Sequence, residues 1–115
     1  MITPTATEEN SQTDALCRAA KYGEWKNFES ILANVSSVEV INTISARRSF
    51  GTLHQIAYWG SINALNTLIQ QFGSEVNLDL LTREESPRSM VQVATDRGHR
   101  QFAAHLMKLM LSRAV

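Results

Sequence analysis

Cysteine is almost absent from this sequence. Cys17 is the only cysteine among the 115 residues, so no disulfide can form within the chain, and no zinc site can be built from several thiolates. Both absences are typical of proteins that work in a reducing compartment. We therefore expect the protein to act inside cells, in the cytoplasm or the nucleus.

The chain also lacks a net charge and a long apolar run. Eleven Lys and Arg residues balance eleven Asp and Glu residues, so no overall field draws the chain toward nucleic acid or an anionic membrane. No stretch approaches the roughly 18 apolar residues of a membrane helix, and the first residues show no secretory signal. We expect neither nucleic acid nor a membrane as a partner. Delivery into a host cell without a classical signal peptide stays open.

Residues that build catalytic and cofactor sites are sparse. The five glycines form neither a G-x-G-x-x-G pattern nor a P-loop, so the sequence offers no cradle for a nucleotide phosphate. The three histidines, His54, His99 and His105, have no second ligand at metal-binding spacing. No nucleophile, base and oxyanion set can be assembled from them and Cys17. We predict no enzyme activity, no cofactor and no bound metal.

The chain does contain an internal repeat. Aligning the sequence on Gly23, Gly60 and Gly98 gives three similar segments, spaced by 37 and 38 residues. In each segment an alanine precedes the glycine by three or four positions, and apolar residues recur at helical spacing on both sides. A glycine in the left-handed conformation would end one helix and let a second, antiparallel helix begin. The pattern therefore predicts a mainly helical fold of three stacked helical hairpins.

The second segment carries the motif of a known family. Its residues Thr52, Leu53, His54, Ala57 and Gly60 resemble the T-P-L-H-x-A-A-x-x-G signature of the ankyrin repeat, and the other two segments resemble it more distantly. The likeness spans about residues 13–112 and implies a repeat solenoid of stacked helix-turn-helix hairpins. It also implies that His54 is a buried structural residue and that the protein binds other proteins.

The segments depart from the family pattern in three respects. In the second segment Ile56 replaces the first alanine of the pair. No segment has a proline before its first apolar position, and both spacings exceed the usual ankyrin period of about 33 residues. We place the additional residues in two connections, 34–51 and 73–86, which we expect to be β-hairpin-like or irregular fingers. The first connection is expected to include a helical turn.

The expected domain organisation follows from these segments. A flexible lead-in occupies residues 1–12, and a single repeat domain occupies 13–115, with repeats at about 13–50, 51–85 and 86–115. Helix starts are expected at Thr13 or Asp14 and at Ser86 with Pro87, because a side-chain oxygen can cap the first turn and proline suits the first helical position.

Three aromatic residues occur where the first helix of a hairpin should end. Tyr58 and Trp59 come just before the second glycine, and Tyr22 aligns with Trp59 one repeat earlier. Arg97 continues the row in the third repeat, which indicates a solvent-facing surface. Exposed aromatics on a rigid scaffold are typical anchors of protein interfaces, and packing against a long connection is the alternative. The predicted partner-binding residues are Tyr22, Tyr58, Trp59, Arg18, Gln55, Arg97, Arg47 and Arg48.

The last expected helix is apolar on most sides. Between Phe102 and Leu111 only His105 and Lys108 are polar, whereas a terminal repeat should present a polar outer face. A protein partner, a second copy of the chain or the protein's own core would cover this surface. We interpret the chain as a non-catalytic protein-interaction module. The alternatives are a small inhibitor of a partner enzyme and a module that dimerises through this helix.

Overall fold

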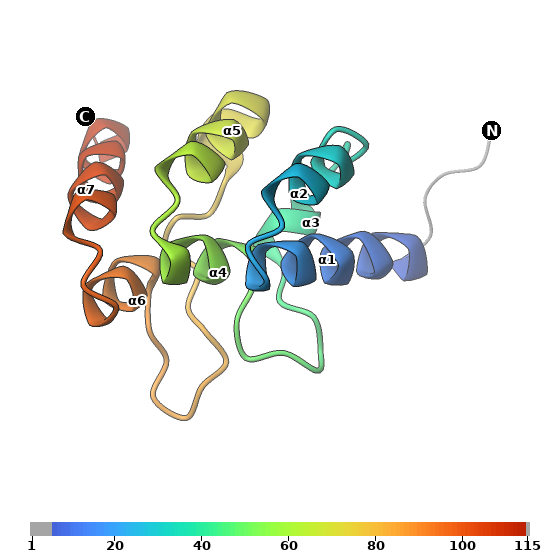
Figure 1. The fold of residues 1–115 in the computed structure, drawn as a ribbon, viewed down its shortest axis with the longest axis horizontal. Coiled ribbons are helices and arrows are strands. Elements are labelled where there is room, and N and C mark those ends of the chain that lie inside the picture. Colours follow the sequence, from blue (N-terminus) through green and yellow to red (C-terminus); the bar gives the residue numbers. More distant parts are fainter. Residues whose placement is uncertain (1–5, 115) are drawn as a thin grey trace.

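The fold is mainly helical, as the sequence predicts. In the computed structural model, residues 6–114 are described, and they form seven α-helices and one 3-10 turn with no β-strand (Figure 1). The elements are α1 (Ala6–Lys21), α2 (Trp25–Leu32), α3 (Glu39–Asn42), α4 (Thr52–Trp59), α5 (Ile62–Phe72), η1 (Gly73–Glu75), α6 (Met90–Asp96) and α7 (Arg100–Ala114). The two long connections are irregular rather than β-hairpin-like, and α3 is the helical turn expected in the first of them.

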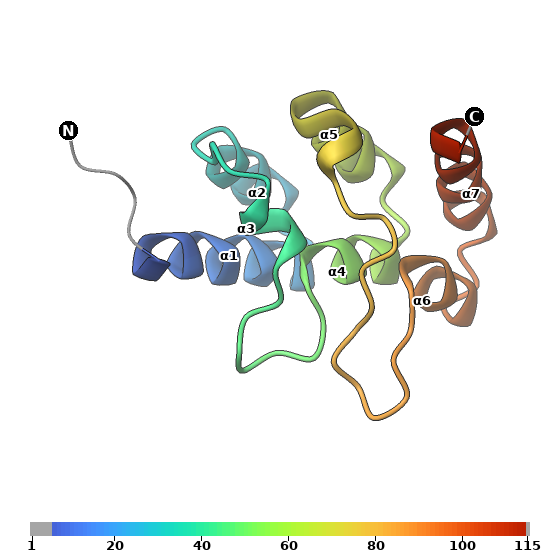
Figure 2. The ribbon, with the colours of Figure 1, turned by 180° about the vertical axis from the view of Figure 1, so that it is seen from behind.

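The helices lie in two rows (Figures 1 and 2). In the first row α4 packs against α1 on one side and against α6 on the other. α2, α5 and α7 form the second row, and each follows directly in the chain from a helix of the first. The long connections extend from the first row away from the second. The two connections therefore lie on the side of α1, α4 and α6 that faces away from α2, α5 and α7.

A glycine turn joins the two helices of each pair. Gly23, Gly60 and Gly98 have φ values of +66°, +67° and +79°, the left-handed conformation that the sequence predicts. After Gly60 the amide of Ser61 donates to the carbonyl of Ile56 at 3.2 Å, and an equivalent bond follows each of the other two glycines. These bonds satisfy carbonyls that the end of a helix leaves without a helical partner.

One apolar core connects all seven helices. Each helix contributes at least one buried side chain to it, among them Leu16, Phe28, Ile41, Leu53, Leu65, Met90 and Phe102. Helices as short as α2, α4 and α6 are not stable alone in water, because nucleation is costly and they contain few hydrogen bonds. Burial against neighbouring helices therefore stabilises the helical conformation of each segment.

The first helix begins earlier than the sequence predicts. α1 starts at Ala6, so Thr13 and Asp14 lie within it and do not begin it. Residues 1–5 of the predicted lead-in lie outside the described residues, and residues 6–12 are helical. Alanine, glutamate and glutamine favour helix in this stretch, and no proline or glycine interrupts it. Thr13 is buried, so tertiary packing outweighs its preference for a helix end.

The third pair also begins at a different residue from the one predicted. α6 starts at Met90, with Ser89 rather than Ser86 as its N-cap. The Ser89 hydroxyl accepts from the amide of Gln92, and the Gln92 side chain accepts from the amide of Ser89. This reciprocal pair forms a complete capping box. The amide of Arg88 donates instead to the hydroxyl of Thr82, which keeps the preceding residues in the connection.

His54 links α4 to both connections. Its ring is fully buried, Nδ1 accepts from the amide of Gly51 at 2.9 Å, and Nε2 lies 2.8 Å from the carbonyl oxygen of Leu80. A carbonyl can only accept, so the proton is on Nε2 and the ring is neutral with both nitrogens bonded. Burial lowers the pKa of His54, although the bond to Leu80 acts in the opposite direction. The structural role expected for His54 is confirmed.

We expect Gly60→Ala to destabilise the protein more than Gly98→Ala. Both glycines have a positive φ, which costs roughly 1–2 kcal/mol for a residue with a Cβ. A Cβ at Gly60 would lie 2.6 Å from Cγ of His99, whereas a Cβ at Gly98 meets nothing within 4 Å. The clash should add about 1–3 kcal/mol to the loss at Gly60. Urea unfolding of the two variants measures this difference, and equal losses would contradict the contact with His99.

We also expect the free energy of unfolding to fall as the pH is lowered from 7.5 to 5.5. Unfolded His54 binds a proton near its ordinary pKa of 6.5, whereas the buried ring binds one only at lower pH. Protonation therefore favours the unfolded state, by up to about 1.4 kcal/mol per pH unit. Urea unfolding across this range should show a shallower pH dependence for His54→Gln than for wild type. Equal slopes would contradict the prediction.

Candidate functional site

An exposed row of aromatic side chains lies at the ends of α1 and α4. Tyr22 follows α1, and Tyr58 and Trp59 form the end of α4. The exposed fractions of these side chains are 58%, 37% and 46%, so all three face solvent as the sequence predicts. We call Tyr22, Tyr58 and Trp59 the aromatic ridge.

Contacts between helices hold the ridge in place. The indole Nε1 of Trp59 donates to the carbonyl of Lys21 at 3.1 Å, and its ring packs against the backbone of Gly23. Tyr58 meets Trp59 edge to face, with 6.3 Å between ring centroids. The ridge therefore joins α4 to the end of α1 and has little freedom to rearrange.

Cations lie over both tyrosine rings. The guanidinium carbon of Arg97, at the end of α6, is 4.2 Å from the ring centroid of Tyr58. The ammonium of Lys21 is 5.6 Å from the ring centroid of Tyr22. Both distances fall within the range of cation–π attraction. The structure thus brings Arg97 to the ridge, as predicted, and adds Lys21, which is not among the residues predicted from the sequence.

His99 supports the ridge from beneath. Its Nε2 lies 2.8 Å from the carbonyl oxygen of Tyr58, so it donates a hydrogen bond to the last turn of α4. The same ring packs against Gly60. The side chain that follows the third glycine therefore orients the helix end that carries Tyr58 and Trp59.

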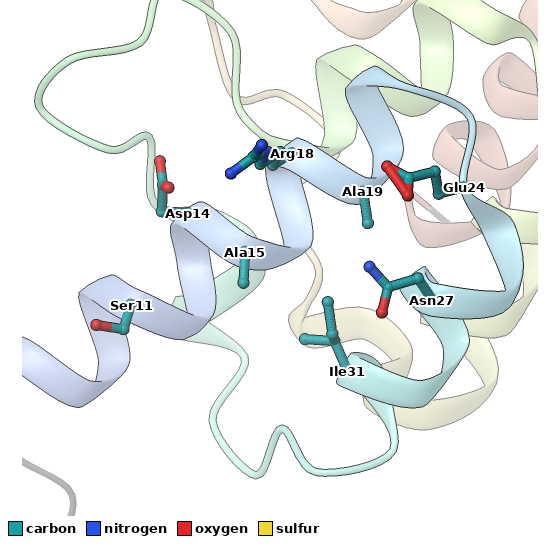
Figure 3. A pocket seen from close by; sticks show the side chains of 8 residues that line it. All are labelled: Ser11, Asp14, Ala15, Arg18, Ala19, Glu24, Asn27 and Ile31. Atoms are coloured by element: carbon teal, nitrogen blue, oxygen red, sulfur yellow. The ribbon is translucent and has the colours of Figure 1, made fainter.

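The remaining predicted residues divide between two surfaces. Arg47, Arg48 and Gln55 line a groove of about 270 Å³ together with Lys21, Ser49 and Phe50. Arg18 lines a separate groove of about 690 Å³ between α1 and α2, with Ser11, Asp14 and Ala15 among its neighbours (Figure 3). The structure therefore does not bring all eight predicted residues together.

Arg48 has a structural contact that the sequence did not reveal. Its Nε donates to the carboxylate of Asp14 at 2.7 Å, which attaches the first connection to α1. This bond to Arg48 lowers the pKa of Asp14.

The thiol of Cys17 lies 3.5 Å from the carbonyl oxygen of Phe50 on the same connection, and burial raises the pKa of this thiol. Cys17 is thus a buried, neutral packing residue.

Arg88 organises the second connection. Its guanidinium contacts both carboxylate oxygens of Glu84, at 2.9 and 3.0 Å, and one oxygen of Asp96 at 2.9 Å. Its guanidinium carbon lies 5.4 Å from the ring centroid of Phe50, and the amide of Arg83 donates to the carbonyl of Ser49 at 2.8 Å. The two connections are therefore in contact. With two carboxylates on Arg88, its charge is compensated locally.

The apolar C-terminal helix is covered on one side by the protein itself. Phe102, Ala103 and Leu106 are buried in the core, and Arg113 donates to the carbonyls of Val76 and Gly73. Two apolar side chains, Met107 and Leu111, remain exposed. Most of the apolar side chains of α7 therefore pack in the protein's own core. Dimerisation through this helix stays a prediction.

Other kinds of site find no support in the described part of the chain. Among the side chains that the structure describes, those of residues 11–113, no three from His, Cys, Asp or Glu gather where they could hold a metal ion. None of the helices described is long and apolar enough to cross a membrane. Models of known protein families give no match to the chain, and a search of curated proteins finds no match either. Its function must therefore be inferred from its own residues.

We expect Arg88→Gln to lower the free energy of unfolding by about 1–2 kcal/mol, because it removes a bidentate ion pair, a second ion pair and a contact with Phe50. Arg83→Gln is the matched control on the same connection. The side chain of Arg83 is exposed and its bond to Ser49 uses the backbone, so a change within about 0.5 kcal/mol is expected. Urea unfolding measures both losses, and equal values would contradict the role of Arg88.

Proposed function

We propose that this protein is a non-catalytic protein-interaction module built from three ankyrin-type repeats, and that the aromatic ridge is the centre of its binding surface. One observation carries the proposal: the ridge combines exposed aromatic side chains with a rigid support from three helices. Trp59 is bonded to the end of α1, Tyr58 is covered by Arg97 at the end of α6, and both side chains belong to α4.

The ankyrin-type interpretation is supported by the recurrence of the same local geometry. Each of the three helix pairs turns at a left-handed glycine followed by the same backbone bond, and α4 packs between the first helices of the other two pairs. His54, within the family-like motif, is buried and bonds backbone on both connections. Divergence in the connections accounts for the longer spacing.

Binding is favoured by the physical character of the ridge. Aromatic side chains bury a large area with few rotatable bonds, and they dominate the free energy of many interfaces. Because Trp59 and Tyr58 are already held by neighbouring residues, little conformational entropy would be lost on association. We expect the partner to be a protein met inside cells.

We expect the double variant Tyr58→Ala/Trp59→Ala to lose a partner that the wild-type protein captures from a cell lysate. Loss of one anchor typically costs about 2 kcal/mol, or about 30-fold in affinity, so removal of both should weaken the affinity for the captured protein by about 30-fold to about 900-fold, the upper figure applying if the two losses add. Quantitative capture would identify the partner, and calorimetric titration of the purified partner would measure its affinity for each variant. If that partner is an enzyme, its activity is measured with and without this protein. A loss of activity would indicate an inhibitor, and unchanged activity would indicate binding alone.

The control variant is Met107→Ala/Leu111→Ala, which removes two exposed apolar side chains from α7 instead. It should bind the partner with wild-type affinity. All variants must have equal helical content by circular dichroism, since Trp59 also packs on Gly23. Equal binding by wild type and the ridge variant would place the interface elsewhere. Loss of binding in the α7 variant would indicate that the interface lies on α7. A solution mass of two chains would favour dimerisation through α7.

A further inference from the structure

The groove beside the ridge is basic although the chain as a whole is neutral. Its six lining residues are Lys21, Arg47, Arg48, Ser49, Phe50 and Gln55, which include three cations and no carboxylate. We call it the basic groove. Its volume of about 270 Å³ is suited to one or two side chains of a partner rather than to an extended ligand.

Part of this positive charge is not compensated locally. Arg48 is paired with Asp14, but among the side chains described, those of residues 11–113, no ion pair joins Lys21 or Arg47 to a carboxylate. Three cations against one carboxylate leave two positive charges at the groove. The balancing acidic residues include Glu29, Glu39, Glu75 and Asp79, on α2, on α3, on η1 and after η1. The groove therefore has a local excess of positive charge although the chain is neutral overall.

The basic groove is continuous with the ridge through Lys21. The ammonium of Lys21 lies near the ring of Tyr22, its carbonyl accepts from the indole of Trp59, and the residue lines the groove. A partner side chain seated on Trp59 would therefore be followed within a few residues by side chains at the groove. The ridge and the basic groove could therefore bind neighbouring residues of a single partner segment.

The chemistry of the groove matches a carboxylate. Arg47 presents a planar guanidinium that can donate two parallel hydrogen bonds to a carboxylate, and Lys21 presents a compact positive charge. Gln55 and Ser49 add uncharged hydrogen-bonding groups at the same groove. Nucleic acid fits less well, because backbone binding uses a row of cations along several phosphates.

We propose that the basic groove binds an aspartate or glutamate side chain of an acidic segment in the partner protein, next to the apolar residue that occupies the aromatic ridge. The inference rests on the proposed binding function and specifies the chemistry of the partner. It assigns Lys21 and Arg47 as the residues that select for acidic side chains. Arg48 holds the wall of the groove through its bond to Asp14.

Nuclear magnetic resonance titration with two blocked peptides tests the proposal. One peptide has a leucine followed by three glutamates, and its twin has three glutamines in their place. The glutamate peptide should shift the signals of Lys21, Arg47 and Gln55 as well as the indole signal of Trp59. The glutamine twin should shift only the indole signal and bind at least fivefold more weakly. With only two tryptophans in the chain, the indole signal is readily assigned.

A charge-matched pair of variants separates the groove from general electrostatics. Lys21→Gln/Arg47→Gln should reduce affinity for the glutamate peptide at least fivefold and leave that for the glutamine twin unchanged. Lys26→Gln/Arg100→Gln removes the same charge from two exposed residues that do not line the groove, and it should have little effect. Equal losses in the two double variants would overturn the inference.

The remaining outcomes distinguish this inference from the proposed function. Equal affinity for both peptides at the ridge would overturn the carboxylate groove and leave the binding function in place. Shifts at the groove that persist in Trp59→Ala would support the groove and count against the ridge as anchor. No shift with either peptide at millimolar concentration would overturn the groove. Larger shifts of the groove signals with a short single-stranded DNA than with the glutamate peptide would also overturn the carboxylate groove, and they would indicate a phosphate ligand.

Discussion

At Gly60 the chain reverses with a φ of +67°, and the ring of His99 occupies the space where any other residue would place its Cβ. This contact joins the turn of the second helix pair to the start of the last helix. From the same position His99 bonds the carbonyl of Tyr58, so the packing at the turn also sets the direction of the final turn of α4. Trp59 then connects that turn to α1. Two side chains, His99 and Trp59, thus fix the end of α4 against α7 and α1.

The long connections depend on two further side chains of opposite character. His54 is buried and neutral, and it joins the backbone at Gly51 to the backbone at Leu80. Arg88 is charged and half-buried, and it joins Glu84, Asp96 and Phe50. Irregular connections have no ladder of backbone hydrogen bonds, so a few side chains must satisfy their polar groups. These contacts help to order both connections, which extend from the first row away from α2, α5 and α7 (Figures 1 and 2).

The proposed binding surface follows from this arrangement. The aromatic ridge lies where the first-row helices end, and the basic groove lies between one of those ends and the first connection. Such a surface would recognise an apolar residue followed by acidic residues, with area supplied by the aromatics and selectivity by the charges. The net charge of zero does not reveal this possibility, because no carboxylate lines the groove itself.

The sequence by itself determined the helix pairs, their three glycine turns and the exposure of Tyr22, Tyr58 and Trp59. These features depend on local backbone preference and on periodic spacing, which a sequence states directly. It did not determine where α1 and α6 begin, because Thr13, Ser86 and Ser89 are all acceptable caps and burial or a distant hydrogen bond selects among them. Only the tertiary structure paired Arg48 with Asp14 and Arg88 with Glu84 and Asp96, and so left Lys21 and Arg47 as the uncompensated cations. The pairing of Arg48 with Asp14 joins residues 34 positions apart, and Arg88 reaches Glu84 within an irregular connection, so neither pair lies within a single helix.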